Sequence, residues 1–227
     1  MSKIRILYVE DDEALAFITK EEMLQEDYEI VHCDNGKTAI DTFDNEHFDL
    51  AILDIMLPQV DGFEIAKHIR SKNEEVPILF LSAKSLEEDR LKGFEIGADD
   101  YLTKPFSMDE LLFKIKIFLK RRNVENTSQH NNYTFCGYEF SPNDLTLKSN
   151  KVKYDITAKE ADLLALLLDN ANTTVKRSDI LIKLWGKNDY FLGRSLDVFI
   201  SRLRKYLADS DEVQIETVRG VGFKLSK

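Results

Sequence analysis

The stretch Phe48-Asp-Leu-Ala-Ile-Leu-Asp54 decides the fold, because it is an apolar run of strand length that ends in a carboxylate. Three further apolar runs also end in polar side chains: Ile4-Arg-Ile-Leu-Tyr-Val9 before Glu10-Asp11-Asp12, Val76-Pro-Ile-Leu-Phe-Leu81 before Ser82, and Tyr101-Leu-Thr103 before Lys104-Pro105. Such runs are typical of buried parallel strands. Because ligands bind outside the carboxyl ends of parallel strands, we expect these ends to bring carboxylates, a hydroxyl and an amine to one crevice.

Around this stretch, strand and helix patterns alternate through the first half of the chain. Strands are expected at 3–9, 29–33, 48–53, 77–82 and 100–103. Helices fit between and after them, at about 13–26, 36–46, 62–72, 86–96 and 107–121. Five strand–helix units joined by short loops predict an α/β domain over residues 1–121, built on a doubly wound five-stranded parallel sheet.

The pattern changes after a polar segment at 122–132, whose composition is typical of a linker. Short alternating stretches at 133–140, 144–148 and 151–155 predict a small antiparallel sheet. Thr157-Ala-Lys-Glu160 is a helix-capping box, and we expect helices from there to 171, at 177–185 and at 194–207. A hairpin with Gly220 at its turn fits 213–225. Three helices followed by a hairpin predict an α+β winged helix-turn-helix domain over residues 133–227.

The charge of the 227-residue chain is uneven. The net charge is −10, but residues 1–122 hold 16 Lys and Arg against 27 Asp and Glu, whereas residues 123–227 hold 15 against 14. Any DNA binding by the second half would therefore depend on a local basic patch. No apolar run approaches the ~20 residues of a membrane-spanning helix, and we expect a cytoplasmic protein without a secretory signal or membrane partner. Cys33 and Cys136 match no metal spacing and are expected to be reduced thiols.

The acidic side chains Glu10, Asp11 and Asp54 would repel one another at the sheet edge, by about 4 kcal/mol for one pair ~4 Å apart. A Mg²⁺ ion prefers oxygen ligands, so it would remove that repulsion and neutralise a phosphoryl group attacked by Asp54. Lys104 would supply a fixed positive charge to the phosphoryl oxygens, and Ser82 a hydroxyl that can move toward them. One aspartate after a strand is more often a turn residue or a helix cap, so the prediction rests on the four strand ends together.

Four motifs of the first half resemble those of a response-regulator receiver domain, over residues 1–121. They are Val9-Glu10-Asp11-Asp12, Asp54-Ile-Met-Leu-Pro58 with Asp61-Gly62, Ser82-Ala83-Lys84, and Gly97-Ala-Asp-Asp-Tyr-Leu-Thr-Lys-Pro-Phe106. The resemblance implies that Asp54 accepts a phosphoryl group from a histidine kinase. It implies further site roles: metal binding by Glu10, Asp11, Asp54 and the Met56 backbone carbonyl, phosphate contact by Lys104, a switch hydroxyl on Ser82, and a Tyr101 ring that turns inward when Ser82 moves. Lys104-Pro105 is expected to be a cis peptide and Asp12 to cap the first helix.

The helix expected at 194–207 has an apolar face that belongs to the core, formed by Leu196, Ile200, Leu203 and Leu207. The side chains expected to contact DNA lie on or beside its other face: Arg194, Ser195, Val198, Ser201, Arg202, Arg204 and Lys205. Arginine can pair with guanine edges and valine can meet a thymine methyl group, whereas Asp197 is expected to orient an arginine. Arg219, at the hairpin tip, could enter a minor groove. Taken alone, the helix would rather be interpreted as a solvated basic face.

Four segments of the second half resemble the winged-helix effector of OmpR/PhoB-type regulators, over roughly 133–227. They are Thr157-Ala-Lys-Glu160 with its Leu-rich helix, Leu184-Trp185-Gly186, Asp197-Val198 with Arg202-Leu-Arg-Lys205, and Thr217-Val-Arg-Gly-Val-Gly-Phe223. Two residues depart from the family pattern, because Phe199 stands where many members carry His and Ser201 where many carry Arg. These departures put one or two phosphate contacts in doubt. The resemblance also implies that the loop at about 186–193 contacts RNA polymerase.

Six charged residues are expected on the fourth helix, the loop after it and the fifth helix: Lys92, Glu95, Asp99, Asp100, Glu110 and Lys114. Their mixed signs suit a two-fold homodimer, although a solvated surface carries such charges as well. Together with the resemblance, these features predict a phosphorylation-dependent DNA-binding transcriptional regulator of a two-component system. Phosphorylation of Asp54 with Mg²⁺ would promote dimerisation and promoter binding, and no enzymatic activity is expected beyond the reactions at Asp54.

Two alternatives belong to other functional classes. A phosphohydrolase could use Asp54 as its nucleophile, but such enzymes commonly carry a second Asp two residues later, where this chain has Met56. A receiver-type scaffold could regulate DNA binding without phosphorylation. The acidic pair, Ser82 and Lys104 make that alternative less attractive.

Overall fold

The computed structural model describes residues 3–83, 93, 96–123, 132–186 and 190–227. The chain forms two compact units, residues 1–127 and residues 128–227, each with its own sheets. Among the described helices, none has the length and apolar character needed to cross a membrane.

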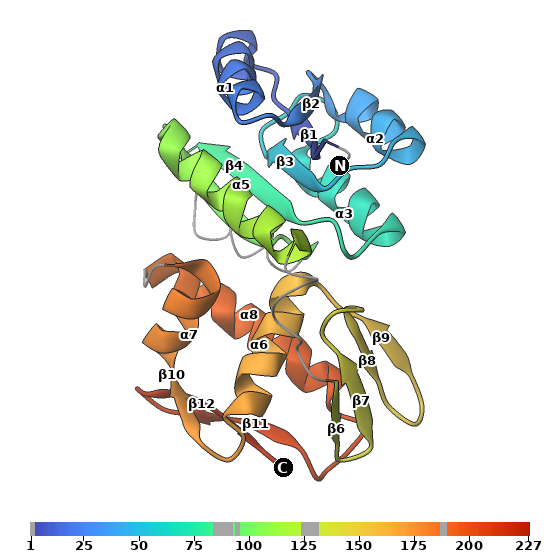
Figure 1. Ribbon diagram of the computed structural model, residues 1–227, viewed down its shortest axis with the longest axis vertical. Coiled ribbons are helices and arrows are strands. Elements are labelled where there is room, and N and C mark those ends of the chain that lie inside the picture. The colour runs from blue at the N-terminus through green and yellow to red at the C-terminus, as the bar shows by residue number, and fades with distance from the viewer. Residues whose placement is uncertain (1–2, 84–92, 94–95, 124–131, 187–189) are drawn as a thin grey trace. The chain divides into compact units, whose positions relative to one another are not determined.

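The first unit is a parallel sheet with helices on both faces (Figure 1). Its strands are β1 (Arg5–Val9), β2 (Glu29–Cys33), β3 (Leu50–Asp54), β4 (Ile78–Ala83) and β5 (Asp100–Lys104). They lie in the order β2-β1-β3-β4-β5, and every neighbouring pair is parallel. The prediction of a doubly wound five-stranded sheet is therefore confirmed.

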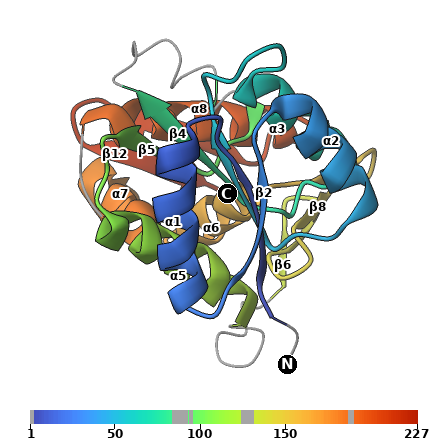
Figure 2. The ribbon, with the colours of Figure 1, turned by 90° about the horizontal axis from the view of Figure 1, so that it is seen from above.

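The described helices of this unit are α1 (Glu13–Gln25), α2 (Gly36–Asn45), α3 (Gly62–Lys72) and α5 (Met108–Asn123). Helices α1 and α5 cover one face of the sheet, and α2 and α3 cover the other (Figures 1 and 2). Asp12 caps α1, as predicted, by accepting hydrogen bonds from Ala14 N and Leu15 N. The helix expected at 86–96 lies mostly outside the described residues.

Most strand residues are buried, on both faces of the sheet, as in β3, where every residue from Leu50 to Asp54 is buried. Alternate strand residues such as Tyr8, Ile52 and Leu81 are fully buried and pack in one core with residues of α1 and α5. The ladders pair Val9 with Leu53 and Asp54 with Leu81, so the polar residues that follow these strands emerge at the same edge of the sheet.

The described residues of the second unit form two small antiparallel sheets and three helices. The first sheet has the order β6-β7-β8-β9, formed by β6 (Tyr133–Phe135), β7 (Tyr138–Ser141), β8 (Thr146–Lys148) and β9 (Lys153–Asp155). The helices are α6 (Ala158–Asp169), α7 (Arg177–Trp185) and α8 (Tyr190–Tyr206). The second sheet has the order β10-β12-β11, formed by β10 (Thr174–Lys176), β11 (Gln214–Val218) and β12 (Gly222–Ser226). This arrangement is the predicted winged helix, and the capping box of Thr157 and Glu160 is present at the start of α6.

Three details of the second unit differ from the sequence-based expectation. The stretch 133–140 forms two strands, because Cys136 and Gly137 both have positive φ angles (46° and 81°) and turn the chain. Strand β10 was not predicted. Helix α8 begins at Tyr190 rather than at 194 and includes Gly193, whose missing side chain leaves room for Arg177: a β-carbon there would lie 3.3 Å from Arg177 Nε.

Candidate functional site

A buried cluster of charged side chains lies at the carboxyl edge of the parallel sheet. Asp54, the last residue of β3, is 5% exposed, and Glu10, the residue after β1, is 1% exposed. Lys104, the last residue of β5, bridges them: its Nζ is 2.6 Å from Asp54 Oδ2 and 2.8 Å from Glu10 Oε1. The structure therefore brings together three side chains that lie up to 94 positions apart in the sequence.

The same edge provides an oxygen-rich cluster that fits a divalent cation. One carboxylate oxygen from each of Glu10, Asp11 and Asp54 lies within 4.8 Å of the others. Glu10 and Asp54 are buried, whereas Asp11 is exposed at the rim. Buried Glu10 Oε2 accepts no hydrogen bond, although it forms an ion pair with Lys104 Nζ at 2.6 Å. The cluster has three carboxylates and one ammonium group, and buried Glu10 Oε2 can still accept a further bond. Its carboxylate oxygens are the hard oxygen ligands that Mg²⁺ prefers.

Burial changes the acidity of this cluster. The pKa of Glu10 is raised to about 7, because desolvation of its carboxylate and the nearby charge of Asp54 outweigh the hydrogen bond from Lys104. For Lys104, desolvation lowers the pKa, but the hydrogen bonds to Asp54 and Glu10 more than compensate, and the net shift is upward. Lys104 is therefore a permanent positive charge at neutral pH, held against the oxygens of Asp54.

The remaining predicted residues of this site lie on β4 and β5 and directly after β3. Met56 N donates a hydrogen bond to Asp54 Oδ1 at 3.0 Å, and Met56 is 69% exposed. The Lys104–Pro105 peptide is cis, as predicted. Ser82 is buried and its Oγ donates to Ala83 O at 2.8 Å. Tyr101 already lies inside, with its ring centroid 5.2 Å from that of Phe80, so the structure holds the inward arrangement of this ring.

Three residues expected at a dimer interface are buried within the unit, so this part of the prediction is wrong. Asp99 is 2% exposed and pairs with Arg70, and Asp100 and Lys114 are 4% and 5% exposed and pair with each other. A buried charge is stable only when another group compensates it, which explains why these partners lie inside together. Glu110 is half-buried. Lys92 and Glu95 lie outside the described residues.

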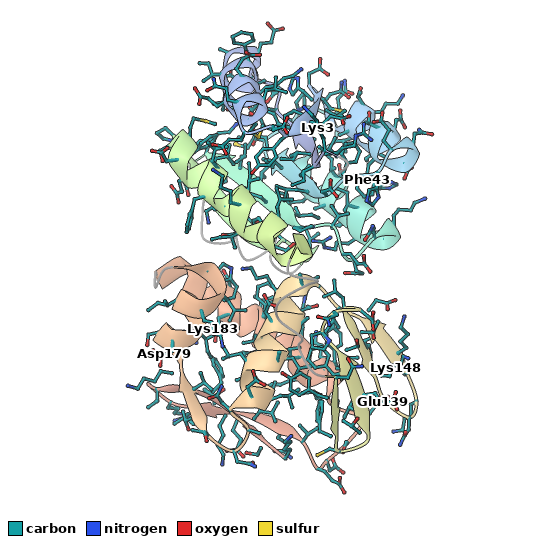
Figure 3. The ribbon with its side chains drawn as sticks, viewed as in Figure 1. Lys3, Phe43, Glu139, Lys148, Asp179 and Lys183 are labelled. Carbon is teal, nitrogen blue, oxygen red and sulfur yellow. The ribbon has the colours of Figure 1, made fainter. Side chains whose placement is uncertain are left out.

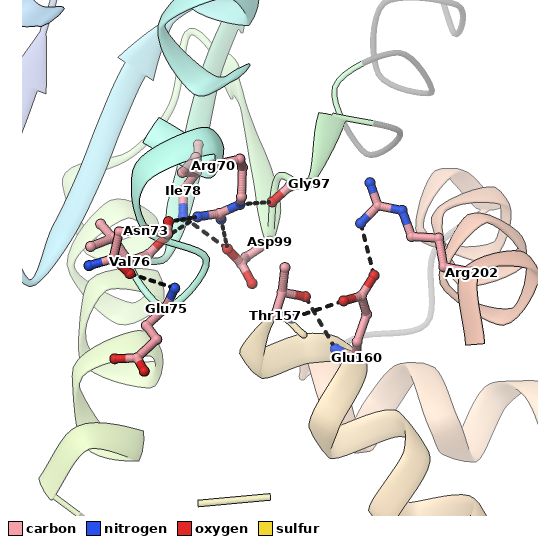
Figure 4. Close-up of polar contacts among 10 residues, drawn as sticks. All are labelled: Arg70, Asn73, Glu75, Val76, Ile78, Gly97, Asp99, Thr157, Glu160 and Arg202. Atoms are coloured by element: carbon pink, nitrogen blue, oxygen red, sulfur yellow. Dashed lines mark hydrogen bonds and ion pairs between the residues drawn. The ribbon is translucent and has the colours of Figure 1, made fainter. Parts of the chain in front are cut away.

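Arg70 is a buried residue that the sequence analysis missed. Its Nε donates to Gly97 O at 2.9 Å, its Nη1 to Val76 O at 2.6 Å, and its Nη2 to Asp99 Oδ2 at 2.9 Å (Figure 4). Asp99 Oδ2 also accepts from Ile78 N at 2.9 Å. One guanidinium thus joins the end of α3, the start of β4 and the loop before β5. A signal existed, because an arginine at this position interrupts the apolar face of α3.

Helix α8 of the second unit carries most of the residues expected to contact DNA. The predicted core residues Leu196, Ile200 and Leu203 are buried. Ser195 is only 1% exposed, so its assignment to the DNA-contacting face is wrong: the helix turns it toward the interior. Phe199, which departs from the family pattern, is buried against Trp185 with ring centroids 5.7 Å apart, so its ring serves packing.

Three arginines hold α8 to its neighbours. Arg177 Nη1 and Nη2 donate to the two carboxylate oxygens of Asp197 at 2.8 and 2.7 Å, which confirms that Asp197 orients an arginine and identifies it. Arg202 Nη1 donates to buried Glu160 Oε1 at 2.8 Å, beside the capping box (Figure 4). Arg204 donates to strand β11. Arg202 and Arg204 therefore have structural partners, whereas the side chain of Arg194 lies outside the described residues.

Four described residues of α8 are exposed: Asp197, Ser201, Arg204 and Lys205. Asp197 and Arg204 have the partners given above, which leaves Ser201 and Lys205, with half-buried Val198 beside them, as the stripe that can face DNA. Arg219 is exposed at the tip between β11 and β12, where Gly220 has a φ of 71°. A helix stripe and a cationic hairpin tip of this kind suit a major groove and an adjacent minor groove.

Comparisons with known proteins match a known domain to each unit. Residues 6–116 match the model of the response regulator receiver domain, and residues 151–225 match that of the transcriptional regulatory protein C-terminal domain. The chain is 40% identical to the transcriptional regulatory protein RprY of Bacteroides fragilis over 223 residues, which cover 98% of this chain and 94% of RprY. It is 36% identical to the response regulator ArlR of Staphylococcus aureus over 220 residues, 96% of this chain and 98% of ArlR. Among solved structures, DrrB of Thermotoga maritima, an OmpR/PhoB homologue, is 30% identical, with full coverage of both chains and a TM-score of 0.53.

Proposed function

Because this chain belongs to the OmpR/PhoB-type response regulators, we propose that phosphorylation of Asp54 controls promoter binding by its winged helix. The chain combines a receiver domain with a winged-helix DNA-binding domain and is a transcription regulator of a two-component system. The phosphoryl donor is a cognate histidine kinase. The proposal concerns the chemistry at Asp54 and its consequence for the second unit.

The observation that carries the proposal is the contact of Lys104 Nζ with Asp54 Oδ2 at 2.6 Å. In the phosphoryl transfer, an oxygen of Asp54 forms a bond to phosphorus while the bond from phosphorus to the donor imidazole nitrogen breaks. The imidazole leaves with that electron pair. Lys104 then faces the phosphoryl oxygens in place of the carboxylate, and its positive charge stabilises them.

Glu10, Asp11 and Asp54 would hold Mg²⁺, with the backbone carbonyl of Met56 as a further proposed ligand. The ion, when bound, supplies charge neutralisation to the transferring group. The Met56 side chain is exposed and offers no acid two residues after Asp54, so this site lacks the second carboxylate that a phosphohydrolase commonly uses. The aspartyl phosphate would therefore persist as a signal.

The signal would pass from Ser82 and Tyr101 to a two-fold dimer of the first unit. The half-buried residue Glu110 and the predicted residues Lys92 and Glu95 remain the proposed dimer contacts. Promoter DNA would be contacted by Val198, Ser201, Lys205, Arg194 and Arg219. The segment between α7 and α8, of which residues 187–189 lie outside the described residues, is proposed to contact RNA polymerase.

The test treats the full-length chain with acetyl phosphate and Mg²⁺ and follows Asp54 phosphorylation by mass spectrometry. We expect one phosphoryl group in the wild type and none in Asp54→Ala. Sedimentation should show a gain of dimer, and affinity for DNA fragments selected by the chain should rise. Labelling without a change in DNA affinity would refute the switch, absence of labelling would favour the scaffold alternative, and steady phosphomonoester turnover would favour the phosphohydrolase.

A further inference from the structure

The wing of the second unit is a hairpin whose tip must point in a fixed direction to reach DNA. Its tip residues Arg219, Gly220 and Val221 are exposed. Gly220 has a φ of 71°, and a β-carbon there would meet nothing within 4 Å, so the backbone conformation and not space requires glycine. Val221 N donates to Val218 O at 3.0 Å and closes the turn. The direction of the tip is therefore set by the strands beneath it.

Strand β11 lies at the edge of its sheet, because the strand order is β10-β12-β11. An edge strand has backbone groups on its outer side that the sheet does not use. Arg204, near the end of α8, occupies that side of β11. Its Nε donates to Ile215 O at 2.8 Å, and its Nη2 donates to Thr217 Oγ1 at 2.8 Å. One guanidinium thus joins α8 to two positions of the strand that leads into the wing tip.

The geometry of these two bonds distinguishes Arg204 from an ordinary phosphate contact. A phosphate needs only a nearby positive charge, which lysine also supplies. The carbonyl of Ile215 and the hydroxyl of Thr217 require two donors in a fixed fork, which only arginine has. The bond to Ile215 is partly buried, and that to Thr217 is exposed.

We propose that Arg204 and Thr217 are positioning residues that hold the wing at a fixed angle to α8. Arg219 then reaches the minor groove while Ser201 and Lys205 face the major groove. The inference rests on the proposed DNA-binding function. It reassigns Arg204 from a direct DNA contact to a residue that acts through Arg219.

The test uses the full-length chain, treated with acetyl phosphate and Mg²⁺, and a duplex that this chain enriches from a random-sequence pool. Thr217→Val should weaken binding about fivefold, as expected for one net hydrogen bond. In an Arg219→Ala background the same change should weaken binding less than about twofold, because the group that it positions is already absent. Arg204→Lys keeps the charge but not the fork, so it should behave like Thr217→Val.

Footprinting separates positioning from a general loss of structure. Thr217→Val should lose hydroxyl-radical protection of the minor groove at the wing and keep dimethyl sulfate protection of guanine N7 in the major groove. Thr134→Val changes an exposed strand threonine of the same unit and is the matched control, which should alter neither pattern. Equal losses in both Arg219 backgrounds would overturn the proposal, and so would full affinity in Arg204→Lys.

A measurement without DNA tests the positioning role of Arg204 and Thr217 separately from the proposed DNA binding. If the pool yields no enriched duplex, the DNA-binding proposal fails, but the hairpin can still be followed in the free chain. Amide hydrogen exchange at Val221, whose N–H closes the turn, should be severalfold faster in Thr217→Val than in the wild type or Thr134→Val. Unchanged exchange would overturn the positioning role by itself.

Discussion

A β-carbon built on Gly93 would lie 1.5 Å from the hydroxyl oxygen of Tyr101 and 2.6 Å from its Cζ atom. Tyr101 is 4% exposed, and Phe80 packs against it with ring centroids 5.2 Å apart. The tyrosine ring can lie inside only because position 93 has no side chain. The inward position of Tyr101 therefore depends on the glycine at position 93.

Gly93→Ala should destabilise the protein, although glycine-to-alanine changes within helices normally stabilise by up to about 1 kcal/mol. We expect a cost of about 1–3 kcal/mol, typical of overpacking, because the ring must leave its buried position. Urea unfolding of the full-length chain measures the effect. In a Tyr101→Ala background, the same change should be neutral or stabilising. An equal cost in the two backgrounds would show that the contact with Tyr101 is not the cause.

Mg²⁺ should stabilise the folded chain if the carboxylates of Glu10, Asp11 and Asp54 bind it together. A ligand specific to the folded state stabilises by about 2.7 kcal/mol at one hundred times its dissociation constant. Glu10→Gln keeps the side-chain shape but removes one charged ligand, so most of the Mg²⁺-dependent rise in Tm should disappear. Glu64→Gln, exposed on α3, is the control and should respond as the wild type does. An unaltered response of Glu10→Gln would exclude Glu10 from the site.

The raised pKa of Glu10 gives a pH dependence with a definite sign. Glu10 has a folded-state pKa of about 7, above the ~4.3 of an unfolded glutamate. The unfolded chain therefore releases the proton first, and the contribution of Glu10 to stability falls as pH rises from about 4 to 7. Urea unfolding in the presence of EDTA should show this fall in the wild type and a weaker one in Glu10→Gln. Parallel curves for the two proteins would contradict it.

Arg70 should contribute strongly to the stability of the first unit. Removing one partner of a buried ion pair costs about 3–5 kcal/mol, because the other charge is left uncompensated. Arg70→Met should therefore reduce the free energy of unfolding by several kcal/mol, and Arg70→Met with Asp99→Asn should cost less than the sum of the single changes. Lys72→Met, on the same helix with a side chain 58% exposed, is the control and should have little effect. Additive costs would mean that Arg70 and Asp99 do not act as a pair.

The parallel sheet and the site at Asp54 could be predicted because their signals are local. Each apolar run ends directly before its polar residue. Because the strands are parallel, their carboxyl ends then lie at the same edge of the sheet. The contact of Lys104 with Asp54 needed only that β3 and β5 are parallel and end at the same edge of the sheet, which the alternating pattern indicates.

The partners of the other charges could not be predicted, because charge patterns do not distinguish a solvated charge from a buried pair. Asp99 pairs with Arg70, 29 positions away, and Asp100 with Lys114, 14 positions away. In α8, the hydrophobic periodicity identified which face packs in the core but not how far that face extends around the helix. Buried Ser195 was therefore assigned to the DNA-contacting side. Arg204 was assigned to DNA because its acceptors on β11 arise only from tertiary packing.

Among the cations of α8 whose side chains are described, Lys205 is exposed and makes no contact that packs the helix, so it is the best test of electrostatic DNA contact. If Lys205 neutralises one phosphate, Lys205→Ala should weaken binding similarly for all sequences and reduce the slope of log affinity against log salt by about one. Lys148→Ala is the matched control, because Lys148 is also exposed but lies on β8 opposite Glu139 of β7 (Figure 3). Fluorescence anisotropy with the selected duplex at several salt concentrations measures both proteins. An unchanged slope in Lys205→Ala would place the phosphate contacts elsewhere, whereas a reduced slope in both variants would indicate bulk charge and not the face of α8.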